Sequence, residues 1–124
     1  MCNLPGEHTQ RTYLTVELGL QTVHDTTGER INRCHSYADF LAGCEKLRVR
    51  GVKVDVHLID RMPGETQERM AETVKTLGKL DPHLVKIHLL HPLEGTAPAQ
   101  AYRKRPFSLM TRAEYVRTVC DQLE

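Results

Sequence analysis

The chain has 124 residues and a formal net charge of +1, with 40% hydrophobic and 27% charged residues. This length predicts one modest domain, and the composition is that of an ordinary soluble protein. A net charge so close to zero gives no electrostatic reason to expect a nucleic-acid or membrane surface. Because no apolar run approaches the roughly 20 residues that a membrane helix needs, we expect no membrane association.

The first eleven residues are polar and include Pro5 and Gly6. We therefore interpret residues 1–11 as a loose leader and residues 12–124 as the folded part. The leader lacks the basic start and the apolar core of a signal peptide, which favours a cytoplasmic location.

The spacing of the four cysteines fits neither paired CxxC zinc motifs nor a compact iron–sulfur motif. Free thiols are the expectation in such a composition. Two of them fall on apolar helix faces, which predicts that both are buried. These two are Cys44 and Cys120, and the others are Cys2 and Cys34.

Apolar residues alternate between the period of a strand and the period of a helix along the chain. The predicted order is strand 12–20, a turn or short helix 25–33, helix 36–50, strand 52–59, helix 66–80, strand 84–90, a loop 91–110 and helix 111–123. This βαβαβα order favours a parallel sheet with right-handed crossovers.

Local signals set several of these boundaries. Ser36 with Asp39, and Thr111 with Glu114, have the spacing of helix-starting capping boxes. Gly51 suits the position after a helix because glycine tolerates positive φ. Pro82 ends the preceding helix, since a proline disfavours the α conformation of the residue before it.

Along each predicted strand, apolar and polar residues alternate, so the side chains of one parity (every second residue) are apolar and those of the other parity are polar. The apolar sets include Leu14/Val16/Leu18, Val52/Val54/Val56/Leu58 and Val85/Ile87/Leu89. Helices would cover the apolar face, while the polar face would line the inside of a barrel that holds a site. Three β/α units cannot close a barrel, so the pattern predicts an α/β fold that is one (β/α)3 half of a partial TIM-type barrel. The alternative is a complete small three-layer α/β domain.

The polar parity carries groups that could bind a metal. Glu17, Asp55, His57 and His88 could converge if the three strands are adjacent, and Glu17, His57 and His88 would suit a metal-dependent hydrolase. The alternative, which we favour, is that His57 and His88 hydrogen-bond within a polar lining. A non-catalytic α/β binding or assembly module with open sheet edges is a further hypothesis.

Two other segments have both a functional and a plain interpretation. The Pro63–Thr66 turn could bring its backbone close to a ligand or could simply join a strand to a helix. Its acid, Glu65, would repel phosphate. The basic run 103–105, between Tyr102 and Phe107, could contact RNA, but such a run in a loop is more often solvated.

Four segments resemble one enzyme family, in order and with matching spacing from about Arg11 onward. Residues 13–22 (Tyr-Leu-Thr-Val-Glu-Leu-Gly-Leu-Gln-Thr) resemble the fourth-strand motif of radical S-adenosylmethionine (SAM) enzymes of the Elongator-protein-3/MiaB-like kind. Residues 31–35 (Ile-Asn-Arg-Cys-His) resemble the segment that follows it in the YhcC-type subgroup. Residues 57–66 resemble the fifth strand and its Pro-Gly-Glu-Thr turn, and residues 85–96 resemble the sixth strand and its loop.

The resemblance implies the C-terminal half of a partial barrel that binds SAM and a [4Fe-4S] cluster and forms a 5′-deoxyadenosyl radical. It implies (t)RNA modification for the full-length parent, which would supply the missing N-terminal half of the barrel. By position, Glu17 and Gln21 would lie near the ribose and methionine of SAM. Ile59 and the turn to Glu65 would pass the adenine, and the backbone around Leu90 and His91 would complete its pocket. His57 is a further implied cofactor-binding residue.

The chain also departs from this family. The Cys-x-x-x-Cys-x-x-Cys segment that holds the cluster is absent, so we expect no cluster and no radical chemistry from this chain alone. Cys34 and Arg61 occupy positions where the family has glycine, and Asp60 replaces an apolar residue. These changes predict weak SAM binding.

Overall fold

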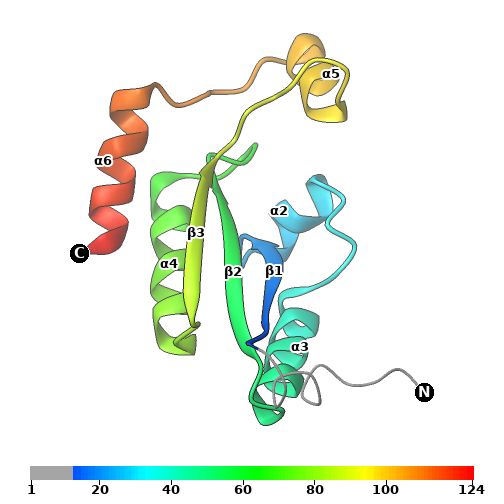
Figure 1. The fold of residues 1–124 in the computed structure, drawn as a ribbon. Helices are drawn as coiled ribbons and strands as arrows, with labels where there is room; N and C mark the ends of the chain where they lie inside the picture. The colour runs from blue at the N-terminus through cyan, green and yellow to red at the C-terminus, as the bar shows by residue number, and fades with distance from the viewer. Residues whose placement is uncertain (1–12) are drawn as a thin grey trace.

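The computed structural model describes residues 13–124, so the leader predicted for residues 1–11 lies outside the described residues. Three strands and five helices follow one another along the chain (Figure 1). They are β1 (Thr15–Gln21), α2 (Asp25–Arg30), α3 (Tyr37–Val49), β2 (Lys53–Asp60), α4 (Gln67–Leu80), β3 (Leu84–Leu89), α5 (Ala97–Lys104) and α6 (Arg112–Leu123).

The strands form one parallel sheet in the order β1-β2-β3, which confirms the predicted α/β fold. β2 lies in the centre, and its residue His57 pairs with Gly19 on one side and with Lys86 on the other. The register of β1 shifts between Gly19 and Gln21, where a bulge ends the regular pairing. The carboxyl ends of all three strands therefore meet at one edge of the sheet.

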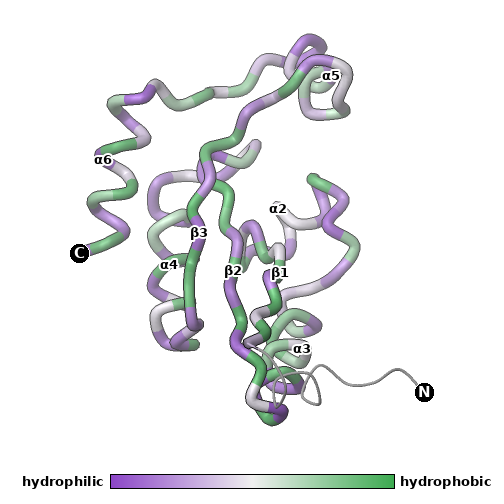
Figure 2. The backbone as a smooth tube through the Cα atoms, viewed as in Figure 1, coloured by the Kyte–Doolittle hydropathy of each residue, from purple (hydrophilic) through white to green (hydrophobic). Residues whose placement is uncertain are grey.

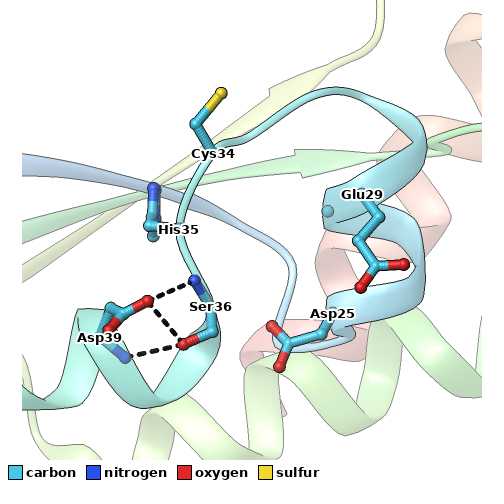
Figure 3. A pocket seen from close by; sticks show the side chains of 7 residues that line it. Asp25, Glu29, Cys34, His35, Ser36 and Asp39 are labelled. Carbon is cyan, nitrogen blue, oxygen red and sulfur yellow. Dashed lines mark hydrogen bonds between the residues drawn. The ribbon is translucent and has the colours of Figure 1, made fainter.

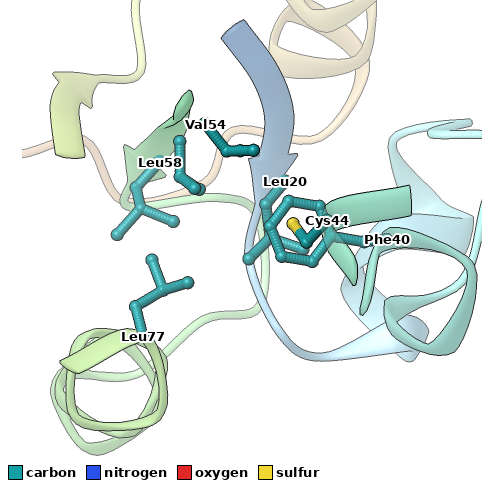
Figure 4. Packing of buried hydrophobic residues seen from close by; sticks show 7 residues of the cluster. Leu20, Phe40, Cys44, Val54, Leu58 and Leu77 are labelled. Carbon is teal, nitrogen blue, oxygen red and sulfur yellow. The ribbon is translucent and has the colours of Figure 1, made fainter. Parts of the chain in front are cut away.

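The core lies between the apolar face of the sheet and helices α3 and α4 (Figure 4). Alternation of polar and apolar residues along the strands is visible in Figure 2, and it sends one parity of β2 into this core. The buried cluster consists of Leu20, Phe40, Cys44, Val54, Val56, Leu58 and Leu77.

The predicted helix boundaries are confirmed where local chemistry defines them. Ser36 with Asp39, and Thr111 with Glu114, form reciprocal capping boxes. Gly51 has φ +69° after α3. α4 ends at Leu80 because the next residue, Asp81, has left-handed φ and precedes Pro82.

The prediction that residues 91–110 form only a loop is wrong, because α5 occupies Ala97–Lys104. Thr96 caps this helix by accepting a hydrogen bond from the Ala99 amide at 3.4 Å. Pro98 is compatible with the first helical turn, where its missing N–H has no intrahelical partner to lose. In Figure 1, α5 stands beyond the edge of the sheet, at the end of one extended segment from β3 and another that leads to α6.

The prediction that the apolar face of the last helix is buried is also wrong. Val116, Cys120 and Leu123 are exposed, and Thr118 is the buried residue of α6. The helix contacts its neighbours through polar groups instead. The prediction that helices cover the apolar parity of β3 holds only in part, since Val85 is 37% exposed.

The three cysteines of the described segment, Cys34, Cys44 and Cys120, are free. Cys44 is buried as predicted, whereas Cys120 is not. None of the helices between residues 13 and 124 is long and apolar enough to cross a membrane.

We expect Leu77→Ala to lower the free energy of unfolding by about 2–5 kcal/mol, because it leaves a cavity under the sheet. Leu77 is 1% exposed and lies at the centre of the core. Leu123→Ala is the matched control, since Leu123 is also on a helix but is 77% exposed. Urea unfolding followed by circular dichroism measures both. Equal losses in the two variants would contradict the assigned core.

Candidate functional site

The polar face of the sheet brings together side chains from all three strands. The carboxylate of Glu17 on β1 contacts the side chains of both His57 on β2 and Lys86 on β3. Its Oε2 is 3.1 Å from Nε2 of His57, and its Oε1 accepts a hydrogen bond from the Lys86 ammonium group. The rings of His57 and His88 lie 5.2 Å apart between centroids. The predicted convergence of Glu17, His57 and His88 is therefore confirmed.

Lys86 holds Glu17 in its ionised form. The hydrogen bond from Lys86 lowers the pKa of the Glu17 carboxyl group, and the electrostatic effects of Lys86 and His57 act in the same direction, against partial burial and the negative charge of Asp55. The side chain of Glu17 is half exposed. It is thus a fixed, accessible hydrogen-bond acceptor on the open face of the sheet. Lys86 was not predicted as a site residue, although its place in the same polar parity as His88 was a signal that could have included it.

Asp55 has the same parity and pairs in register with Glu17, but its side chain has another partner. It is buried, and its Oδ1 is 2.8 Å from Nδ1 of His83, just before β3. Glu17 and Asp55 lie level with Leu84, at the start of β3, whereas His88 lies near the end of that strand. The four predicted residues therefore lie along one face of the sheet, and Asp55 differs from the others in being buried against His83.

Arg33 fixes the carboxyl end of β1. Its guanidinium group donates to the carbonyl oxygens of Leu20 and Thr22 at 3.1 and 2.6 Å, and to Asp25 at 2.6 Å. Gln21, between these carbonyls, has φ +62°. The side chain of Arg33 is 2% exposed. The sequence offered no signal for this role, because two of these three partners are main-chain carbonyl groups 11 and 13 residues earlier in the chain.

Glu65 is directed into the protein rather than toward the open face. It is 6% exposed and accepts a hydrogen bond from Thr22 Oγ1 at 2.5 Å. This contact ties the turn after β2 to the end of β1. The adjacent Gly64 has φ +84°, and Thr66 caps α4 as predicted, through the Arg69 amide at 3.3 Å.

Two residues stand at positions where the radical SAM family resembled by this sequence has glycine, and both adopt the backbone conformation that glycine favours. Cys34 has φ +66° and Arg61 has φ +65°. The side chain of Arg61 reaches the segment before α6, where it donates to Ser108 Oγ at 2.9 Å. The cationic head of Arg61 therefore lies with that segment.

The remaining predicted residues lie at or just after the strand ends. Ile59 is half-buried and pairs with His88 in register. The Leu90 amide donates to the Asp60 carbonyl oxygen at 3.1 Å, and His91 is exposed. Gln21, Ile59 and Leu90 thus come from three neighbouring strand ends at one edge of the sheet, where α/β barrels place their sites.

The residues between 13 and 124 provide no group of three or more His, Cys, Asp or Glu side chains that could hold a metal ion. Their cysteines lie in the loop before α3, in the core and on the exposed side of α6. They do not fit an iron–sulfur cluster, which requires several thiolates around one centre.

A pocket of about 290 Å³ lies between α2 and α3 and includes Cys34 and His35 (Figure 3). Its acids already serve the fold. Asp25 accepts from the Tyr37 amide and Arg33, and Asp39 completes the capping box of α3. We therefore assign this pocket no ligand.

Comparison with known families decides the relationship. The model of the radical SAM superfamily matches residues 10–77, and the model of the Radical SAM C-terminal domain matches residues 82–124. The chain belongs to the radical SAM superfamily. Together the two matches cover all three strands described above.

Relatives of this radical SAM chain are longer proteins. It is 46% identical over 119 residues to the uncharacterized protein YtqA of Bacillus subtilis, and it covers 37% of that protein. Protein YhcC of Escherichia coli is 34% identical over 108 residues, with 35% of its length covered. The tRNA uridine(34) acetyltransferase of Methanocaldococcus infernus is 28% identical over 107 residues, or 20% of its length.

A solved structure shows the same fold. Elongator protein 3 of Methanocaldococcus infernus, with residues 1–46 deleted, superposes with a TM-score of 0.85 over 94% of this chain and 28% of that one. Sequence identity is 24%, so this likeness concerns the fold alone. The three-stranded sheet therefore matches part of a larger radical SAM barrel.

The ionised state of Glu17 gives a pH prediction. Because its folded pKa is below the ordinary value, Glu17 contributes stability above that value and loses it as the pH falls through the folded pKa. We expect Lys86→Met to raise the Glu17 pKa toward normal, as measured by NMR titration of the side-chain carboxyl carbon. Lys75→Met, on the exposed side of α4, is the control and should leave the Glu17 pKa unchanged. An equal response to both variants would contradict the role of Lys86.

Proposed function

We propose that this chain forms one part of the SAM pocket of a radical SAM barrel. The observation that carries the proposal is the meeting of three strand ends at one edge of a sheet whose open face carries the ionised Glu17. The family match makes SAM the ligand to consider, since enzymes of this superfamily use it. The proposed binding residues are the seven that the family resemblance implies, namely Glu17, Gln21, His57, Ile59, Glu65, Leu90 and His91.

Glu17 suits hydroxyl groups of a ribose. A carboxylate held by Lys86 and His57 keeps lone pairs available on its open side, and hydroxyl donors form strong hydrogen bonds with an ionised acceptor. Gln21, at the carboxyl end of the same strand, would lie toward the methionine part of SAM. When SAM is bound to a complete enzyme, its reductive cleavage supplies the 5′-deoxyadenosyl radical.

The adenine would lie across the ends of β2 and β3. His57 and Ile59 offer side chains on the open face, whereas Leu90 and His91 would offer mainly backbone there. Glu65 would act through the turn that it anchors to Thr22, because its carboxylate is committed to that contact. The role of Glu65 is then to hold the turn in place.

The [4Fe-4S] cluster would have to come from another part of the parent protein. The four cysteines do not form the required Cys-x-x-x-Cys-x-x-Cys motif, and the described thiols are widely separated. The chain spans about 37% of YtqA, and we propose that the remaining barrel half supplies the cluster and closes the site. Catalysis by this chain alone is not expected.

RNA modification is the proposed activity of the full-length parent. One relative is a tRNA uridine(34) acetyltransferase. The basic run 103–105 lies at the end of α5, beside an edge-to-face pair of Tyr102 and Phe107 with centroids 5.2 Å apart. Cations next to aromatic rings are the groups that bind a single-stranded nucleic acid.

The metal-dependent hydrolase is the weaker alternative. Glu17, His57 and His88 do lie together, but the Lys86 ammonium group occupies one carboxylate oxygen and would repel a metal cation. We therefore favour the polar lining of a cofactor pocket for these residues.

We expect the purified chain to bind no iron after anaerobic reconstitution with iron and sulfide, because it cannot ligate a cluster. Iron analysis and absorbance near the iron–sulfur charge-transfer band measure this. A variant without the three described thiols, Cys34→Ser/Cys44→Ala/Cys120→Ser, distinguishes adventitious iron from specific binding. Stoichiometric iron in the wild type that this variant loses would contradict the proposal.

We expect SAM to bind weakly, with a dissociation constant on the order of 1 mM, because only part of the pocket is present. Titration with SAM followed by amide NMR should shift signals at the three strand ends. Glu17→Gln should weaken these shifts, whereas Glu45→Gln, on the exposed side of α3, should not. Shifts confined to other regions, or insensitive to Glu17, would refute the assigned pocket.

A further inference from the structure

The carboxyl end of β2 meets α6 through one buried acid and one amide. Gln122 Nε2 donates to Asp60 Oδ1 at 2.9 Å. Asp60 is 3% exposed and lies on the helix-covered side of the sheet, opposite the face that carries Glu17. The structure thus places a carboxyl group where water does not reach it.

Two oxygen atoms of this pair lack hydrogen-bond partners. Asp60 Oδ2 and Gln122 Oε1 are both buried, and neither has a donor among the described residues. Each is an acceptor if Asp60 is ionised, so they cannot satisfy one another in that state. An unsatisfied buried polar atom is costly, and two of them on one contacting pair require an explanation.

One proton satisfies both atoms. We infer that Asp60 is a neutral carboxylic acid in the folded chain, and that its O–H donates to Gln122 Oε1 to close a two-bond acid–amide ring between β2 and α6. The ring uses the complete donor and acceptor set of the amide edge that faces Asp60. The inference concerns how α6 docks, and it does not depend on cofactor binding.

The surroundings of Asp60 favour this neutral form. Burial raises the pKa of its carboxyl group, the hydrogen bond from Gln122 opposes this shift, and the nearby Glu65 raises the pKa further. On α6, Tyr115 faces Asp60, and burial first and the aspartate second raise the pKa of the tyrosine hydroxyl group. The adjacent cation, Arg61, directs its guanidinium group to Ser108. The described segment gives Asp60 no ion pair.

The ring makes the attachment of α6 dependent on pH. The other side-chain bonds between α6 and the rest of the fold are those of Thr118 to Gln67 and of Tyr115 to the Ile87 carbonyl oxygen, at 3.3 and 3.0 Å. Ionisation of Asp60 would remove one bond of the ring and leave a buried charge beside Glu65. We therefore expect α6 to loosen as the pH rises through the folded pKa of Asp60.

The direction of the stability change follows from proton linkage. Because the folded pKa is raised, the native state holds a proton that the unfolded state has lost, at every pH between the ordinary value and the folded value. The contribution of Asp60 is therefore greatest at low pH and declines across this window. Relative to a variant that cannot ionise, the folding equilibrium constant should fall by up to tenfold per pH unit.

The direct test is an NMR titration of the Asp60 carboxyl carbon in the wild-type chain. We expect its pKa to lie clearly above the ordinary aspartate value and the Thr118 and Gln122 amide signals to move with the same midpoint. A midpoint at or below the ordinary value would overturn the inference, and this measurement does not require any variant to fold.

A matched pair of variants tests the ring itself. In Asp60→Asn, the new amide can donate to Gln122 Oε1 and accept from its Nε2 without titrating. Its unfolding equilibrium should then lack the decline that wild type shows across the window. Asp121→Asn, an exposed neighbour on α6, is the control and should keep it. Identical pH profiles for wild type and Asp60→Asn would refute the proposal.

Discussion

The sheet depends on β2, because this strand is hydrogen-bonded in parallel along both of its sides. One parity of this strand forms the core with α3 and α4, and the other presents His57 to the open face. A shift of one residue would exchange these two sets of side chains. The burial of Val54, Val56 and Leu58 therefore fixes which residues can act as a site. The energetics of the core and the placement of the polar groups are two results of one alternation.

The parts of the fold that depend on local signals could be predicted from the sequence. Strand alternation predicted the sheet and the meeting of Glu17 with His57, and the spacing of Ser36 and Asp39 predicted the start of α3. The helix α5 was missed because the three prolines of residues 91–110 suggested a loop, although Pro98 falls where a helix accepts one. The face of α6 was misjudged because its partners are polar. Gln122 and Thr118 bind groups on β2 and α4, and periodicity of apolar residues carries no information about such contacts.

The sequence predicted which residues belong to the candidate site better than it predicted where their side chains point. Parity placed Glu17, His57 and His88 on one face, but it gave Asp55 the same role, although this residue pairs with His83. Glu65 was placed at the correct turn, yet its carboxylate points to Thr22. Arg33 and Lys86 define the geometry at the end of β1 and around Glu17, and both depend on distances between strands that only the folded chain reveals.

The sheet has two edges that pair on one side only within residues 13–124, since β1 and β3 each have β2 as their one neighbour. Apolar side chains lie near one of them, with Leu84 and Val85 both partly exposed on β3. The net charge of +1 provides almost no repulsion between copies at neutral pH. In concentrated solution, the isolated chain therefore has exposed strands that can pair and little charge to keep molecules apart. Its colloidal behaviour should improve at a pH away from its isoelectric point of about 7.8.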